Sequence, residues 1–248
     1  MNSTDTKSQS DELPVLRIQR RLLDLGYDLG KSGPNRDGID GDIGDLSQLA
    51  ILAALESGKR SASVAASTEA PAIFVPLAWM PSARISRIIV HWTAGSHVPS
   101  ERDRQHYHVL IDGAGKAVKG NPSIALNDAG GVRPGYAAHT LNCNTGAIGV
   151  SLCCMAGAIE NPFSSGAAPM TLAQWELLPG VLRDLCRRYG IKVTPQTVLS
   201  HAEVQGTLGI QQRGKWDVSR LSFDPSIRGA REVGDLFRQR TAALLAIP

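Results

Sequence analysis

The alternation of short apolar segments with longer amphipathic ones most constrains the fold of this chain. Four apolar runs have the length and composition of β-strands: residues 87–92, 107–112, 147–152 and 197–201. Two longer segments carry apolar residues at helical spacing: residues 171–189 and 226–246. The sequence therefore predicts an α/β fold in which helices flank a mixed central β-sheet.

The helix predicted over residues 171–189 has clear start and stop signals. Thr171 and Gln174 have the spacing of a capping box, and Gly190 is a natural stop. Pro179 and Gly180 lie inside the pattern. Because proline cannot donate a helical hydrogen bond, we expect this pair to kink or split the helix.

A smaller helical unit precedes this domain. Its first helical pattern includes Ile18 and Leu22, and a turn rich in Gly and Asp follows at residues 37–44. A second helix is expected over residues 47–55, with Leu49 and Leu52 on its apolar side. The Ser/Ala-rich stretch that follows is typical of a linker. We therefore expect three parts: a small all-α domain at 11–57, a linker at 58–73 and a larger domain at 74–248.

Composition and charge exclude two classes of protein. No apolar run approaches the roughly 18 residues of a membrane-spanning helix, and a net charge of +3 is too small to indicate nucleic-acid binding. The polar, acidic N-terminus lacks a signal-peptide pattern. We therefore expect synthesis in the cytoplasm and another exit route if the protein acts elsewhere. The four cysteines lack Cys-x-x-Cys spacing, which favours buried free thiols.

Three segments carry side chains that suit a catalytic metal. His91 ends one predicted strand, His201 ends another, and Asp217 lies two residues after Lys215. Two imidazoles and a carboxylate are three ligands of catalytic zinc, which keeps a fourth position open. Each residue alone has a simpler interpretation, because strand-end histidines are often structural and a lone aspartate is typical of a surface. Only the whole set indicates a zinc-dependent hydrolase.

Two further side chains suit a zinc-dependent reaction. Lys215 can stabilise a developing oxyanion, and its simpler role is a solvated lysine. Tyr107 can hydrogen-bond the attacking water or the oxyanion, and its simpler role is a half-buried strand aromatic. The alternation of a strand places Tyr107 on the same face as Val109 and Ile111, opposite His108.

The order of these motifs resembles the zinc-dependent N-acetylmuramoyl-L-alanine amidases, which include phage endolysins and are similar to peptidoglycan recognition proteins. Five segments carry the resemblance: residues 89–94, 107–113, 139–150, 200–203 and 215–217. The resemblance implies three Zn²⁺ ligands, namely His91, His201 and Asp217. It implies two catalytic side chains, Lys215 and Tyr107. It implies four substrate-binding residues in the cleft, namely Trp92, Thr93, His139 and Asn144.

The implied substrate is the amide between the lactyl group of N-acetylmuramic acid and L-alanine in polymeric peptidoglycan. Two positions depart from the family pattern. Some relatives carry a catalytic glutamate where this chain has Ser151, which shifts proton handling to Tyr107 and the metal. Asp224 precedes a proline, as the ligand aspartate of relatives often does, and it rivals Asp217. We prefer Asp217 because Lys215 accompanies it.

The N-terminal unit resembles a peptidoglycan-binding module at residues 16–19, 25–27 and 40–44, and the alternative is a small helical cap. We therefore predict a monomeric, endolysin-like wall hydrolase. Two alternatives remain: a non-catalytic peptidoglycan-binding protein and a cytosolic amidase that recycles soluble muropeptides. The C-terminal segment carries four arginines beside an apolar stripe: Arg228, Arg231, Arg238 and Arg240. Packing on the catalytic domain is favoured over membrane contact, because Glu232 and Asp235 dilute this charge.

Overall fold

The computed structural model describes residues 14–57 and 73–247. The chain divides into two compact units, residues 1–72 and 73–248. The predicted linker falls almost wholly outside the described residues, as do residues 11–13 of the predicted first domain. No helix of the described part is long and apolar enough to cross a membrane. All four cysteines are free and buried, which confirms the prediction for them.

The smaller unit contains two helices, α1 (Pro14–Asp24) and α2 (Asp45–Ser57). Its small core contains Leu22, Leu29 and Ala50. The apolar side predicted for the second helix is wrong, since Leu49 and Leu52 are 62% and 56% exposed. The helix instead turns the side that carries Ala50 into the core, with Ile51 and Ala54 packed against it.

A buried glutamine holds the Gly/Asp-rich turn of the smaller unit against α1. The Gln19 side chain donates from Nε2 to Asp40 Oδ1 at 2.7 Å and to the Asp42 carbonyl at 2.8 Å. Its Oε1 accepts from the backbone N–H of Gly41 at 2.9 Å. Because amide and carboxylate groups satisfy the turn, the unit can fold around so few apolar side chains.

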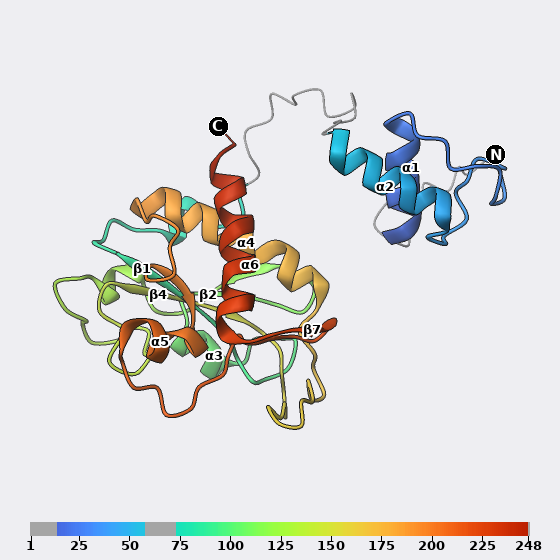
Figure 1. The fold of residues 1–248 in the computed structure, drawn as a ribbon. Helices are drawn as coiled ribbons and strands as arrows, with labels where there is room; N and C mark the ends of the chain where they lie inside the picture. Colours follow the sequence, from blue (N-terminus) through green and yellow to red (C-terminus); the bar gives the residue numbers. More distant parts are fainter. Residues whose placement is uncertain (1–13, 58–72, 248) are drawn as a thin grey trace, which may run out of the picture. The chain divides into compact units, whose positions relative to one another are not determined.

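The larger unit is built on a five-stranded sheet with the order β3-β2-β4-β1-β5 (Figure 1). The strands are β1 (Arg87–Trp92), β2 (Val109–Ile111), β3 (Ala117–Lys119), β4 (Ala147–Leu152) and β5 (Val198–Ser200). Only β3 is antiparallel to its neighbour. The mixed sheet with flanking helices confirms the predicted fold class. Two 3-10 helices, η3 (Leu77–Trp79) and η4 (Ile124–Asn127), lie in the connections.

The two faces of the sheet have different partners. The helices α4 (Leu172–Tyr189) and α6 (Ala230–Leu245) contact each other and form the main core with Ile88 and Val90 of β1 (Figure 1). The helix α5 (His201–Leu208) contacts β1 and β5, where Ile89 contributes to a second, smaller core. Strand alternation therefore places His91 on the α5 face.

The helix α4 confirms its predicted ends but is not split. The side chain of Thr171 accepts from Gln174 N–H in a capping box, and Gly190 ends the helix with φ 67°. The helix continues through Pro179, which leaves the carbonyl of Trp175 without its usual helical donor. The Arg240 side chain of α6 donates to that carbonyl at 3.4 Å. This contact gives the freed carbonyl a donor from the neighbouring helix.

The last helix starts later than predicted. Residues 224–228 form β7 (Asp224–Arg228), which pairs with β6 (Arg220–Leu221) in a two-stranded ribbon. Gly229, with φ 117°, precedes α6. This backbone conformation favours glycine and separates the ribbon from the helix.

A buried ion pair ties α6 to the start of α5. The Arg238 Nη2 atom lies 2.8 Å from Glu203 Oε1. Glu203 Oε2 in turn accepts from the backbone N–H of Ser200 at 2.8 Å and from its hydroxyl at 3.1 Å. Glu203 itself is only 5% exposed. The carboxylate is buried because α6 supplies its counter-ion.

The close approach of α6 to Glu203 predicts different outcomes for two glycine variants. A Cβ at Gly234 would lie 2.3 Å from Glu203 Oε2, whereas a Cβ at Gly206 of α5 meets nothing within 4 Å. Gly234→Ala should lower the free energy of unfolding by about 1–3 kcal/mol. Gly206→Ala should raise it by about 0.5–1 kcal/mol. Denaturant unfolding measures both, and a Gly234→Ala protein as stable as wild type would contradict the packing.

Candidate metal centre and cleft

Three neighbouring segments bring the predicted ligands together. His91 is the next-to-last residue of β1, and His201 is the first residue of α5, directly after the neighbouring strand β5. Because β1 and β5 run parallel, both strands end at the same edge of the sheet. Asp217 joins them through its carbonyl, which accepts from the Ala202 N–H of α5 at 2.6 Å.

The donor atoms of these three side chains form a compact triangle. His91 Nδ1, His201 Nδ1 and Asp217 Oδ2 each lie 3.1 Å from the other two. Tetrahedral zinc at ordinary Zn–N and Zn–O bond lengths separates its ligand atoms by about 3.3 Å. The triangle therefore has the size of one face of a zinc tetrahedron. Within the described ranges, this is the only group of three or more His, Cys, Asp or Glu side chains that could hold a metal ion.

The protonation states of this group favour a cation. Burial lowers the pKa of His91 to about 4, so the imidazole is neutral at pH 7. Burial alone would raise the pKa of Asp217, but hydrogen bonds with His201 and His91 outweigh it and hold this pKa below its usual range. A buried carboxylate beside two imidazoles is a donor set typical of Zn²⁺.

The second ring nitrogen of His91 and of His201 also has a partner. His201 Nε2 lies 2.9 Å from Gln212 Oε1, and Gln212 Nε2 donates to the Leu141 carbonyl at 2.9 Å. The amide oxygen can only accept, so His201 carries its proton on Nε2 and directs the Nδ1 lone pair toward the triangle. His91 Nε2 lies 3.2 Å from His139 Nδ1 and 3.3 Å from Thr140 Oγ1.

Two side chains behind these histidines, Gln212 and Thr140, were not predicted from the sequence. Gln212 lies in the segment between His201 and Lys215, where no periodicity or motif marks one residue above another. Thr140 directly follows His139, and its hydroxyl lies 2.8 Å from His139 Nδ1. Only the fold brings these two side chains to the backs of the ligand histidines.

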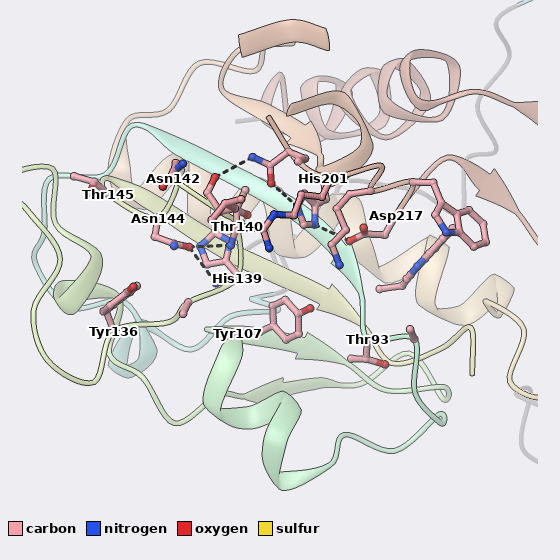
Figure 2. A pocket seen from close by; sticks show the side chains of 18 of the residues that line it. Thr93, Tyr107, Tyr136, His139, Thr140, Asn142, Asn144, Thr145, His201 and Asp217 are labelled. Atoms are coloured by element: carbon pink, nitrogen blue, oxygen red, sulfur yellow. Dashed lines mark hydrogen bonds and ion pairs between the residues drawn. The ribbon is translucent and has the colours of Figure 1, made fainter. Parts of the chain in front are cut away.

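The triangle lies beside a cavity of about 820 Å³. In Figure 2, Tyr107 lies across the pocket from Asp217, with Thr93 toward one end and Tyr136 toward the other. Every predicted site residue except His91 lines this cavity, and His91 is fully buried behind them. The rival Asp224 is not among the lining residues, and its carboxylate instead accepts from the Ser226 N–H at 3.2 Å.

Tyr107 reaches the cavity by a route that the sequence did not predict. A short helix, α3 (Glu101–His106), ends at Tyr107, and β2 begins only at Val109. The prediction that Tyr107 shares a face with Val109 and Ile111 is therefore wrong. Its ring centroid lies 5.1 Å from that of His91. Burial and the charge of Asp217 raise the pKa of Tyr107, so its hydroxyl stays protonated and can donate.

The remaining predicted residues have distinct surroundings. Lys215 is exposed in the cleft, and the neighbouring Trp216 packs edge-on against Trp92 with ring centroids 4.8 Å apart. Thr93 Oγ1 accepts from the Gly95 N–H at 3.1 Å.

Ser151 is fully buried and lies beside His91 in the register of β4 and β1.

Asn144 and His139 belong to one buried polar network. Asn144 Oδ1 accepts from the backbone N–H groups of His139 at 3.0 Å and Thr140 at 2.9 Å. Asn127 donates to the Asn144 carbonyl at 3.0 Å and lies 3.0 Å from His108 Nε2. The network therefore fixes the segment that carries His139 against the segment that carries His108.

The sequence of the domain that contains this site matches a known protein family. The sequence profile of the N-acetylmuramoyl-L-alanine amidases matches residues 81–218, which include all the predicted ligands and cleft residues. The chain belongs to this amidase family. No curated protein matches the chain significantly.

Several solved structures are similar to the amidase domain. The endolysin amidase LysCS from Clostridium intestinale URNW has 16% identity over 52% of this chain and 86% of its own, with a TM-score of 0.34. The amidase AmiD from E. coli has 24% identity over 50% of each chain and a TM-score of 0.34. The endolysin from Thermus scotoductus bacteriophage Ph2119 has 14% identity over 70% of this chain and 93% of its own, with a TM-score of 0.39.

The buried His108 predicts a pH-dependent stability of the metal-free amidase domain. Its Nδ1 accepts from the Gly149 N–H at 3.0 Å, and burial lowers its pKa from 6.5 to about 4. The unfolded chain binds this proton below about pH 6.5 and the folded chain only below about pH 4. The free energy of unfolding should therefore fall as pH drops through this window, by roughly 3 kcal/mol for this group.

Urea unfolding of the metal-free protein at pH 7 and pH 4.5 measures this loss. In a His108→Gln variant, which lacks the titrating group, the difference between the two pH values should be roughly 2–3 kcal/mol smaller than in wild type. The same difference in both proteins would show that His108 does not titrate as its surroundings require.

Proposed function

We propose that this chain is a zinc-dependent N-acetylmuramoyl-L-alanine amidase that cleaves polymeric peptidoglycan and acts as an endolysin. One observation carries the proposal: the triangle of His91 Nδ1, His201 Nδ1 and Asp217 Oδ2, with edges of 3.1 Å, borders an open cleft in an amidase-family domain. Its substrate would be the bond between the lactyl group of N-acetylmuramic acid and L-alanine.

The three side chains of the triangle would hold Zn²⁺. When bound, zinc supplies Lewis-acid chemistry that polarises a carbonyl and strengthens water as a nucleophile. Gln212 and His139 would keep the ligand imidazoles oriented through their Nε2 atoms.

The side chains around the triangle would handle charge and protons. Lys215 would stabilise negative charge as it develops on the carbonyl oxygen. Tyr107 keeps its proton and would donate a hydrogen bond from its phenol oxygen to the reacting group. Asp217 is the only carboxylate among the residues that line the cavity, and it is committed to the triangle. Tyr107 therefore takes over work that a glutamate in place of Ser151 would perform.

Mass analysis of digested sacculi tests the function and its rivals. The proposal predicts free stem peptides with an L-alanine N-terminus and glycan strands that keep the lactyl group. Sacculi that bind the protein but remain uncut would support a non-catalytic binding protein. Cleavage of soluble muropeptides without cleavage of the polymer would support a recycling amidase.

We further propose that the protein is a monomer made in the cytoplasm, that it reaches the wall after release, and that its smaller unit binds the wall. For the C-terminal helix, two contacts support packing on the domain over membrane binding. Arg238 is buried against Glu203 of α5, and Arg240 pairs with Glu176 of α4.

Two aspartate variants test the metal ligands. Asp217→Asn should abolish stoichiometric zinc and turnover, because it removes the charged donor of the triangle. Asp224→Asn changes a carboxylate that lies outside the cavity, so zinc content and activity should stay at wild-type levels. Elemental analysis after dialysis measures the zinc. Loss of zinc in the second variant but not the first would assign the ligand to Asp224.

A pair of glutamine variants tests the partner of His201. Gln212→Ala should weaken zinc binding about 10- to 100-fold, because the imidazole loses the acceptor that sets its tautomer. The control is Gln211→Ala, an exposed neighbour that does not line the cavity. Competition with a chromophoric chelator gives both dissociation constants. Equal affinities would show that Gln212 does not support the ligand.

A further inference from the structure

The cleft carries more positive charge than its own acids can neutralise. Two cationic side chains line the cavity, Arg213 and Lys215, and the only lining carboxylate is Asp217. That carboxylate is committed to His91 and His201. Across residues 14–57 and 73–247, no side chain forms a hydrogen bond or ion pair with the exposed Arg213. An unpaired arginine in a cleft is suited to an anionic group of the substrate.

The backbone next to Arg213 is held firmly at the metal centre. The neighbouring Gln212 contacts His201 through Oε1 and donates to the Leu141 carbonyl through Nε2. Its backbone N–H donates to Gln205 Oε1 at 3.0 Å. Arg213 is therefore one residue away from a side chain that contacts a ligand histidine. Because the backbone is already fixed, less conformational entropy is lost when the long Arg213 side chain becomes ordered around a ligand.

The chemistry of the substrate offers a matching anion, if the proposed function holds. The scissile amide and the L-alanine methyl group are uncharged. The next residue of the stem peptide is a D-glutamate joined through its γ-carboxyl, so its α-carboxylate is free unless the wall amidates it. This is the first carboxylate along the stem, one residue from the scissile bond. A guanidinium binds a carboxylate through two parallel hydrogen bonds, which a carboxamide cannot match.

We propose that Arg213 is a specificity-determining residue that binds the free α-carboxylate of the second stem residue. The amidase therefore prefers peptidoglycan with D-glutamate over peptidoglycan with the amidated form at this position. This inference rests on the proposed function, and it names the wall chemistry that the same cleft selects.

Two synthetic substrates isolate this one group. Both are disaccharide tripeptides that end in L-lysine carboxamide, and they differ only in a carboxylate or carboxamide at the α-position of the second residue. For the full-length zinc-loaded enzyme, we expect kcat/KM to be about tenfold higher for the carboxylate, since a charged hydrogen-bond pair gives discrimination of this order. Arg213→Gln should remove the preference, mainly through a higher KM for the carboxylate substrate. Arg213→Lys should restore part of it.

A matched control separates Arg213 from general charge. Arg228→Gln removes the same charge from an exposed position outside the cavity, and it should keep the wild-type preference. Equal cleavage of both substrates by wild type, or an unchanged preference in Arg213→Gln, would overturn the inference and leave the amidase function intact. Failure of wild type to cleave either substrate or sacculi would overturn the proposed function itself.

Discussion

The amidase domain buries a carboxylate and two imidazoles whose facing atoms lie 3.1 Å apart, and the rest of the domain must hold them there. Burying the charge of Asp217 is costly unless partners compensate it. The two imidazoles contribute nitrogen donors beside this buried carboxylate, so the three side chains together suit a cation. The surrounding structure holds these three side chains together, because water would otherwise solvate each polar group separately.

The support for this group comes from distant parts of the chain. The strand β1 fixes His91, and its neighbour β5 leads directly into His201. Behind His201, the carboxylate of Glu203 closes the first turn of α5 and is neutralised by Arg238 of the C-terminal helix. The C-terminal helix thus stabilises the cleft through a buried ion pair, and the same contact explains why glycine occupies position 234.

The sequence predicted those parts of the site whose signals are local. His91 follows an unbroken apolar run, and Lys215 favoured Asp217 over Asp224. Other features depend on tertiary contacts that no local pattern reveals. The carbonyl that Pro179 leaves free in α4 accepts a hydrogen bond from Arg240 of the other helix. Tyr107 changes face because a short helix ends directly before it, and Gln212 reaches His201 through a loop whose position no local pattern indicates.

The most direct test of this account is a crystal structure of the zinc-loaded protein with anomalous data collected at the zinc edge. The account predicts one strong anomalous peak in the amidase domain, bonded to His91 Nδ1, His201 Nδ1 and Asp217 Oδ2. A peak held by Asp224 or by other side chains, or no peak at this triangle in protein that retains stoichiometric zinc, would contradict it.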